Sequence, residues 1–299
     1  MGVSIQVQSV IYNNDKKDLI KAISCAANAA RVERGAQHAV SRYSCRYGDA
    51  SETPVFTPEE VEEIRRQFAD ALDFEYTFFG FNSGSARGEN LLGLDSDADY
   101  LVIMNPDVLM QGRFFIEMLQ PFAQADVGIV EARQTPVEHP KEYNIQTMET
   151  EWATGACFMI RSALFRQLKG FDSDTFFMYC DDVDLSWRVR LAGYKIIYQP
   201  LAPVFHAKRL SAKGAWMPSP LEMRDSAKAA MLMAHKWSNP EWLARLLDIY
   251  QNSGVPEYQE GARQFLQLQA EGKLPAPIDP EHRVARFLDG LYTEHRFAL

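Results

Sequence analysis

Two acidic segments of the sequence hold residue types that could do chemistry. Asp107 ends the segment Asn105-Pro106-Asp107, directly after the apolar run 100–104. A carboxylate at the end of a strand is a hard oxygen ligand for Mg²⁺ or Mn²⁺, and such a metal can bridge diphosphate oxygens. The alternative is a turn or helix cap, a role that a single aspartate in this position commonly has.

The second acidic segment follows the aromatic run 176–179 and begins a predicted helix. Acidic side chains favour a helix N-terminus through capping and the helix dipole, and Asp184 can pair with Arg188 four residues later. These structural roles do not explain why Asp181 and Asp182 both follow a run of aromatic residues. Adjacent carboxylates near an apolar surface can have separated pKa values, and one of them can then act as a general base.

His206 and the basic residues after it form a third candidate. Lys208, Arg209 and Lys213 follow His206 in an otherwise acidic chain. A basic loop near a metal suits a phosphate-bearing substrate. The alternative is a hydrogen-bonded structural histidine followed by a solvated loop.

A further group of aspartates has suggestive spacing but the wrong place. Asp95, Asp97 and Asp99 precede the apolar run 100–104. We therefore expect them at the amino end of that strand, in a solvated turn away from the ligand edge.

The elements that would position these residues alternate between strand and helix. Hydrophobic patterning predicts strands at 3–11, 39–47, 74–81 and 100–104, with helices at 15–30, from Thr57 to Leu72, and at 85–94. Thr57, Pro58 and Glu60 form a capping-box signature. This order predicts an α/β fold with a mostly parallel sheet flanked by helices. Ligands of such sheets bind beyond the carboxyl ends of the strands, which here means segments 12–14, 48–51, 82–84 and 105–107.

The remainder of the chain changes in character. Strands are predicted at 127–132, 153–160 and 194–198, and helices at 182–192, 221–237, 241–251, 258–271 and 281–291. We place a boundary near 215, between a catalytic domain at 1–215 and a C-terminal helical region at 216–299. The apolar side chains of 221–237 favour packing on the catalytic domain over dimerisation, and dimerisation over lipid contact.

Composition excludes several classes of protein. The 299 residues are 46% hydrophobic and 24% charged, typical of a folded protein. The net charge of −9 disfavours sequence-independent binding to nucleic acid. The sequence shows no signal-peptide pattern and no apolar run near the ~18 residues of a membrane span, so we expect a cytoplasmic protein with at most peripheral contact with the inner face of a membrane. The cysteines lack metal-binding spacing and are expected to be free thiols; they are Cys25, Cys45, Cys157 and Cys180.

Several short segments, taken in order, carry a family resemblance. They are VIYNN (10–14), GDAS (48–51), NSGSARGEN (82–90), MNPDV (104–108), TGACFMIR (154–161), GFD (170–172), FFMYCDDVDLSWRVRLAGY (176–194), VFH (204–206) and KW (236–237). Together they resemble an inverting family 2 glycosyltransferase with a GT-A fold. The nearest similarity is to rhamnosyltransferase-like enzymes of bacterial surface polysaccharide synthesis, of the O-antigen or capsule type.

The resemblance implies a role for each matching residue. It implies that Asp182, with Asp181 beside it, is the catalytic base, and that Asp107 and His206 are ligands of Mn²⁺ or Mg²⁺. The implied donor site is Tyr12, Asn13, Asp49, Asn82, Arg87, Asn105 and Asp107. The implied sugar and acceptor site is Trp152, Thr154, Gly155 and Ala156, and the implied phosphate loop contains Lys208 and Arg209.

Three positions depart from the family pattern. Ala50 replaces an asparagine that usually contributes to nucleoside contacts, Asn105 replaces a carboxylate of the metal motif, and Asp181 stands where glutamate is more frequent. The Q-x-x-R-W motif of processive synthases is missing from the sequence.

The implied reaction is a single displacement. A sugar would move from a nucleotide-sugar donor, dTDP-rhamnose or a UDP-sugar, to a hydroxyl of a saccharide or lipid-diphosphate-linked saccharide. One alternative is a non-catalytic glycosyltransferase-like scaffold. A second is a sugar nucleotidyltransferase, which should carry a Gly-rich basic loop where this chain has Tyr-Asn-Asn-Asp at 12–15.

Overall fold

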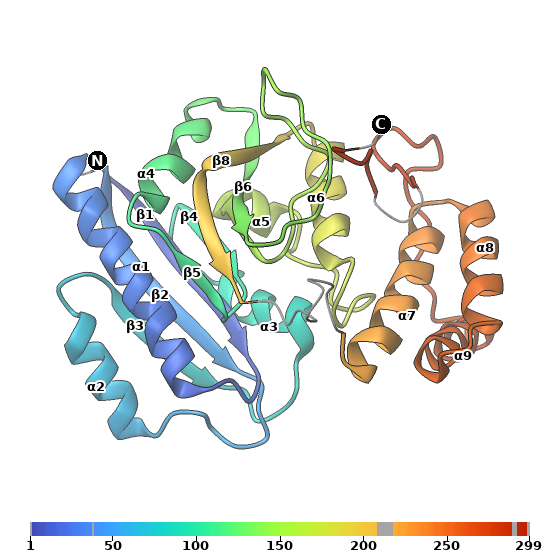
Figure 1. Ribbon diagram of the computed structural model, residues 1–299, viewed down its shortest axis with the longest axis horizontal. Helices are drawn as coiled ribbons and strands as arrows, with labels where there is room; N and C mark the ends of the chain where they lie inside the picture. Colours follow the sequence, from blue (N-terminus) through green and yellow to red (C-terminus); the bar gives the residue numbers. More distant parts are fainter. Residues whose placement is uncertain (1, 38, 208–217, 289–291, 298–299) are drawn as a thin grey trace.

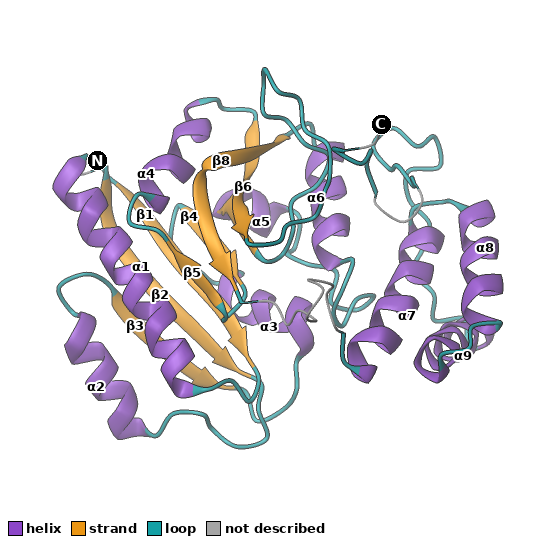
Figure 2. Cartoon of the chain, in the orientation of Figure 1, coloured by secondary structure: helices purple, strands orange, loops and turns teal. Residues whose placement is uncertain are grey.

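An eight-stranded sheet forms the centre of the molecule (Figure 1). The computed structural model describes residues 2–37, 39–207, 218–288 and 292–297. The strand order is β3-β2-β1-β4-β7-β6-β8-β5. Helices cover both faces of this sheet, as expected for an α/β fold (Figure 2).

The first four strands are parallel, as the alternation of strand and helix predicts. They and their connecting helices are β1 (Val3–Ile11), α1 (Lys16–Ala36), β2 (Val40–Asp49), α2 (Pro58–Phe68), β3 (Asp73–Phe78), α3 (Gly84–Gly93) and β4 (Tyr100–Met104). The capping box of α2 forms: the backbone N–H of Glu60 donates to the Thr57 hydroxyl at 3.3 Å, and the Glu60 carboxylate accepts from the Thr57 N–H at 2.8 Å.

The second half of the sheet is mixed. It contains β5 (Val108–Met110), α4 (Phe114–Leu119), η1 (Gln120–Ala123), β6 (Val127–Thr135), β7 (Cys157–Arg161), α5 (Ser162–Gln167), α6 (Asp181–Leu191) and β8 (Lys195–His206). Strand β7 is antiparallel to β4 and β6, and β5 is antiparallel to β8. Strand β5 does not pair with β4, because the strand order places it at the far edge of the sheet beside β8.

Strand β4 is wholly apolar because it packs on both sides. Leu101 and Ile103 belong to one hydrophobic cluster, and Val102 and Met104 belong to the other. Alternate side chains of a strand point to opposite faces, so the strand joins two cores. It thereby holds the segment 105–107 at the edge of the sheet.

Three helices follow the sheet domain in the described part of the chain: α7 (Pro220–Lys236), α8 (Pro240–Gln251) and α9 (Pro256–Ala270). Helix α7 packs on α6, where the rings of Trp187 and Trp237 meet edge to face at 5.1 Å. None of the described helices has the length and apolarity needed to cross a membrane. The boundary at 215 lies outside the described residues and stays a prediction.

Three sequence predictions differ from the structure. Strand β8 extends to His206, well beyond the predicted 194–198, because its pairing with β6 resumes at Pro203 after a register shift. Segment 153–156 is not a strand. The predicted helix at 281–291 is wrong for its described part, 281–288, because the Asp279 carboxylate accepts the N–H groups of Arg283, Val284 and Ala285 that a helix would use otherwise.

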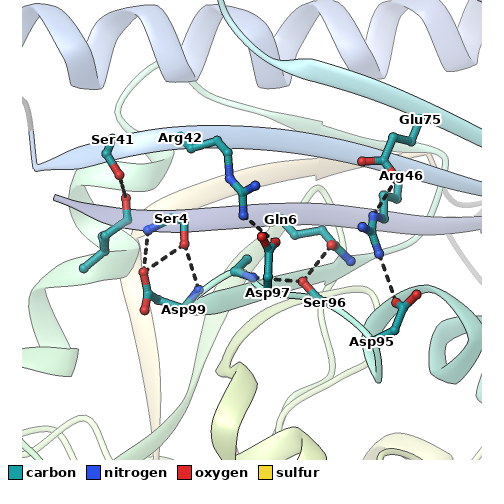
Figure 3. A network of polar contacts seen from close by, with 12 residues as sticks. Ser4, Gln6, Ser41, Arg42, Arg46, Glu75, Asp95, Ser96, Asp97 and Asp99 are labelled. Carbon is teal, nitrogen blue, oxygen red and sulfur yellow. Dashed lines mark hydrogen bonds and ion pairs between the residues drawn. The ribbon is translucent and has the colours of Figure 1, made fainter.

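The aspartates before β4 lie at the amino end of the sheet (Figure 3). Asp97 pairs with Arg42, Asp95 pairs with Arg46 at 3.0 Å, and Asp99 accepts the Ser4 N–H at 2.7 Å. The position predicted for these carboxylates is confirmed.

Candidate functional site

The carboxyl ends of β1 and β2 lie side by side. Ile11 pairs with Asp49 in the sheet, and the Asn13 N–H donates to the Ser51 hydroxyl at 2.8 Å. Tyr12 is 45% exposed beside them. The structure therefore brings the candidate donor residues Tyr12, Asn13 and Asp49 to one edge.

Asp49 is buried beneath its own loop. Its carboxylate accepts the N–H groups of Ser51 and Val55 at 2.9 and 2.7 Å, and it also accepts the Tyr76 hydroxyl. Burial, and then the hydrogen bond to Asp49, raise the pKa of Tyr76. In this conformation Asp49 organises loop 50–55, and its carboxylate is not open to solvent.

The N-terminus of α3 is packed against the segment before α6. Gly84 has a φ of +65°, and a Cβ at this position would lie 2.3 Å from the Phe177 carbonyl oxygen. Asn82 accepts the Gly84 N–H at 3.1 Å. Arg87 is exposed, stacks over the Phe81 ring at 4.6 Å, and lines an open cavity between α3 and 168–174.

Asp107 and His206 face each other across the β5–β8 pair. The His206 Nε2 lies 3.4 Å from the Asp107 carboxylate and 3.4 Å from the Asn105 side-chain amide. The His206 Nδ1 lies 3.0 Å from the Gln134 Oε1. The Gln134 amide nitrogen donates to the Thr154 hydroxyl at 3.4 Å, which orients the amide oxygen toward the histidine. The Gln134 oxygen is thus placed to accept a proton from Nδ1, which would leave the Nε2 lone pair available to a metal ion beside Asp107.

The Asp107 carboxylate and the His206 imidazole fit a divalent cation whose remaining ligands come from a bound substrate. A carboxylate and a neutral imidazole nitrogen suit Mn²⁺ or Mg²⁺. The described residues contain no group of three or more His, Cys, Asp or Glu side chains placed to hold a metal. A bound diphosphate would have to supply further oxygens, as is common for magnesium at phosphate sites.

Segment 152–156 lies between the metal candidates and the acidic pair. The Asn105 N–H donates to the Ala156 carbonyl at 3.0 Å, and the Gly155 N–H donates to the Asp182 carboxylate at 2.8 Å. A Cβ on Gly155 would lie 3.5 Å from the Asp182 side chain, in ordinary contact. Asp107 and Asp182 thus share one region of the sheet edge.

Asp181 and Asp182 begin α6 after an unusual backbone. Tyr179 and Cys180 have φ values of 66° and 57°, in the left-handed region that side chains other than glycine rarely adopt. Asp181 is buried and accepts the Ser85 hydroxyl at 2.7 Å, whereas Asp182 is partly exposed. Of the two carboxylates, Asp182 is the more accessible to a substrate.

Burial dominates the ionisation of both groups. It raises the pKa of Asp181, and the neighbouring Asp182 charge raises it further. Burial also raises the pKa of Asp182, against the opposing effects of the Gly155 and Val183 N–H donors and of the Lys141 charge. A carboxylate with a raised pKa is a stronger proton acceptor.

Other matching segments meet in one polar network behind α6. Lys236 lies 2.6 Å from both Asp172 and Asp184, and Asp184 also pairs with Arg188 at 2.7 Å, as predicted. The Trp237 Nε1 donates to Asp184 at 3.0 Å. This network anchors the helix that carries Asp181 and Asp182.

Several residues around the site were not predicted from the sequence. Gln134, Glu131 and Lys141 contact the candidate residues, and Ser85 contacts Asp181. Glu131 could have been noticed, because a charged residue inside a buried apolar strand needs a partner. Trp152 is buried against Lys141, at 4.8 Å from the ring centre, while Lys208 and Arg209 lie outside the described residues.

No family model matches the chain. The sequence is 28% identical over 142 residues to the rhamnosyltransferase WbbL of Escherichia coli K12, covering 38% of this chain and 52% of that protein. It is 44% identical over 57 residues to an N-acetylglucosaminyl-diphospho-decaprenol L-rhamnosyltransferase of Mycobacterium tuberculosis (strain CDC 1551 / Oshkosh), covering 19% of this chain and 18% of that protein. The chain thus spans about half the length of the first relative and less of the second.

Solved structures show the same fold. A mannosyltransferase from Pyrobaculum calidifontis, in complex with GDP-Man and Mn²⁺, matches with a TM-score of 0.60 at 15% identity, over 91% of this chain and 76% of its own. GalNAc-T7 with UDP, GalNAc and Mn²⁺ matches with a TM-score of 0.61 at 11% identity, over 90% and 55%. The chain therefore has the GT-A glycosyltransferase fold, and the comparisons confirm the resemblance of its sequence to rhamnosyltransferases.

Proposed function

We propose that this protein is an inverting glycosyltransferase of cell-surface polysaccharide synthesis. It would transfer a sugar from dTDP-rhamnose or a UDP-sugar to a hydroxyl of a saccharide or lipid-diphosphate-linked saccharide. The proposal rests on one observation above all: segment 152–156 is hydrogen-bonded both to the Asn105 N–H, two residues before Asp107, at 3.0 Å and to the Asp182 carboxylate at 2.8 Å.

The diphosphate of the donor would bind near Asp107. Asp107 and His206 would hold Mn²⁺ or Mg²⁺, and the bound cation would supply positive charge for the departing nucleoside diphosphate. Gln134, 3.0 Å from the His206 Nδ1, would hold the ring in the tautomer needed for this role. Tyr12 and Asn13 would form the nucleoside side of the site, beside the loop that Asp49 organises, with Asn82 and Arg87 farther along the edge.

Asp182 would accept the proton of the acceptor hydroxyl. As that oxygen forms a bond with the anomeric carbon, the bond from this carbon to the diphosphate oxygen breaks. Attack opposite the leaving group inverts the anomeric configuration. Asp181, held by Ser85, would position the first turn of α6, and segment 152–156 would bind the acceptor.

The decisive experiment compares wild type with Asp182→Asn, which keeps the shape and removes the base. The assay uses dTDP-rhamnose, Mn²⁺ and a synthetic N-acetylglucosaminyl-diphospho-lipid, with UDP-sugars as alternative donors, and it measures released nucleoside diphosphate. We expect turnover to fall by about 10² to 10⁴, while calorimetry shows unchanged donor binding. Near-wild-type turnover of the variant contradicts the base assignment, and donor binding without any release in wild type favours a scaffold.

We further propose a cytoplasmic protein in peripheral contact with the inner face of the membrane. A lipid-diphosphate acceptor would draw the enzyme to that surface, where basic residues such as Lys208 and Arg209 favour anionic headgroups. A homodimer is a secondary proposal, to be checked by light scattering.

A further inference from the structure

The structure assigns a positioning role to the C-terminal segment 292–297: it holds Lys141 and, through Lys141, the acceptor side of the site. This inference rests on the proposed function for its consequence in catalysis, but its structural part can be tested separately.

Lys141 is a buried cation in the segment that follows β6. Its side chain is 4% exposed and pairs with Glu131, which is 2% exposed. Lys141 also donates to the Trp152 carbonyl oxygen. A buried ion pair is costly to form and strongly destabilising to break, so the pair fixes the relative positions of the segments that carry it.

The Lys141–Glu131 pair acts directly on segment 152–155. Lys141 holds the Trp152 carbonyl, and the other Glu131 oxygen accepts the Thr154 N–H at 3.1 Å. The next N–H, that of Gly155, donates to Asp182. The Lys141–Glu131 pair and Asp182 thus hold consecutive residues of the same short segment, which fixes the backbone that would line the acceptor site.

The C-terminal segment closes over the outer side of the Lys141 segment. His295 forms a β-bridge with Lys141, and the Glu142 N–H donates to the Glu294 carbonyl at 2.9 Å. Arg296 donates to the Lys141 carbonyl at 3.0 Å and to the Glu138 carboxylate at 2.6 Å.

Arg296 is also held by aromatic rings. Its guanidinium lies 4.6 Å from the Tyr143 ring centre and 4.9 Å from that of Tyr198. The Arg296 side chain is only 14% exposed. Cation–π contacts of a desolvated guanidinium add to its ion pair with Glu138.

The same segment reaches the turn that carries the acidic pair. The Tyr292 hydroxyl lies 3.2 Å from the Cys180 sulfur, and the Tyr292 ring packs at 5.7 Å from Trp187 of α6. Cys180 directly precedes Asp181 and Asp182. Segment 292–297 therefore joins the start of α6 to the Lys141 segment, although it lies more than a hundred positions from both in the sequence.

The first test uses hydrogen exchange, which needs no substrate. Arg296→Ala is compared with the matched control Arg263→Ala, which removes an exposed arginine from α9. We expect Arg296→Ala to raise the exchange rates of the Thr154 and Gly155 amides by about tenfold, with β1–β4 unchanged. Wild-type exchange at residues 138–143 and 152–156 in Arg296→Ala overturns the proposal, and so does equal acceleration by Arg263→Ala.

The second test separates positioning from a general loss of stability. The double variant Lys141→Met with Glu131→Gln replaces the ion pair by neutral groups of similar size, so neither charge is left buried alone. In the transfer assay we expect the acceptor KM to rise roughly tenfold while the donor KM stays within about twofold. Equal changes in both constants, or none, contradict the positioning role. If wild type shows no transfer at all, the proposed function fails while the exchange result still decides the structural part.

Discussion

The amino and carboxyl ends of the central sheet both carry aspartates, but these have different partners. At the amino end, Asp95 and Asp97 pair with arginines of β2, and the Arg42 hydrogen bond lowers the pKa of Asp97. At the carboxyl end, burial raises the pKa of Asp181 and Asp182, and no Lys or Arg ion pair to either occurs among the described residues. Spacing alone therefore does not distinguish the two groups of carboxylates, whereas their burial and their charged partners do.

The most direct test of this difference removes one carboxylate from each end of the sheet. Asp107→Asn takes away the carboxylate beside His206, and we expect the apparent affinity for Mn²⁺ in the presence of dTDP to fall at least about 100-fold. The matched change Asp95→Asn, at the amino end, should leave this affinity unchanged. Calorimetry measures both, and equal losses in the two variants would remove the distinction.

A second prediction uses the direction of a pKa shift. Burial raises the pKa of Glu89, which accepts the Val10 N–H beside the same edge, to about 7. The folded state therefore favours protonated Glu89, and this preference contributes to the free energy of unfolding. The contribution is complete below the unfolded pKa of about 4.3 and is lost as pH rises through about 7.

Chemical denaturation should reveal this dependence. Between about pH 5 and pH 8, the free energy of unfolding of wild type should fall relative to that of Glu89→Gln by on the order of 2 kcal/mol. The Asp181 charge contributes to the raised pKa of Glu89, so the measured difference reports the titration of the two interacting groups together. Parallel pH profiles would show that Glu89 titrates normally.

A third prediction concerns the residue behind His206. Gln134→Leu leaves the Nδ1 proton of His206 without its acceptor, so the ring loses its fixed tautomer and orientation. We expect the affinity for Mn²⁺ to fall about 10- to 100-fold, with little change in thermal stability. Gln134→Glu keeps an acceptor and should retain most of the affinity for Mn²⁺. Equal losses of affinity in the two variants would show that Gln134 does not fix the tautomer of His206.

The smallest expected effect tests the space beside Asp182. Gly155→Ala adds a methyl group that the fold can accept, since its nearest contact is 3.5 Å away. The melting temperature should stay close to that of wild type, and the acceptor KM should rise about threefold to tenfold because the methyl occupies substrate space. An unchanged acceptor KM would show that the acceptor does not approach Gly155.

Local signals account for much of what the sequence predicted. The capping box at Thr57, the apolar strand 100–104 and the pairing of Asp184 with Arg188 each depend on residues within a few positions of one another. The parallel order of the first strands follows from the alternation of elements. These features predict that segments 12–14, 48–51 and 105–107 lie at one edge of the sheet, and the parallel pairing of β1 with β2 and β4 agrees.

The missed features depend on contacts between distant residues. Arg296 and Lys141 are 155 positions apart, and Gln134 and His206 are 72 positions apart. Neither contact leaves a periodic signal. The predicted helix at 281–291 is wrong in its described part, 281–288, for a related reason. The Asp279 carboxylate binds backbone N–H groups that would otherwise pair within the helix.

The end of β4 separates two kinds of evolutionary constraint. Met104 is buried and pairs with Cys157, while the next residue, Asn105, is exposed. Substitutions up to position 104 must preserve two cores at once, but those from 105 to 107 touch neither core. Substitutions at 105 and 106 could therefore adjust the proposed metal and diphosphate site without redesigning the scaffold that supports it, provided that Asp107 keeps its carboxylate.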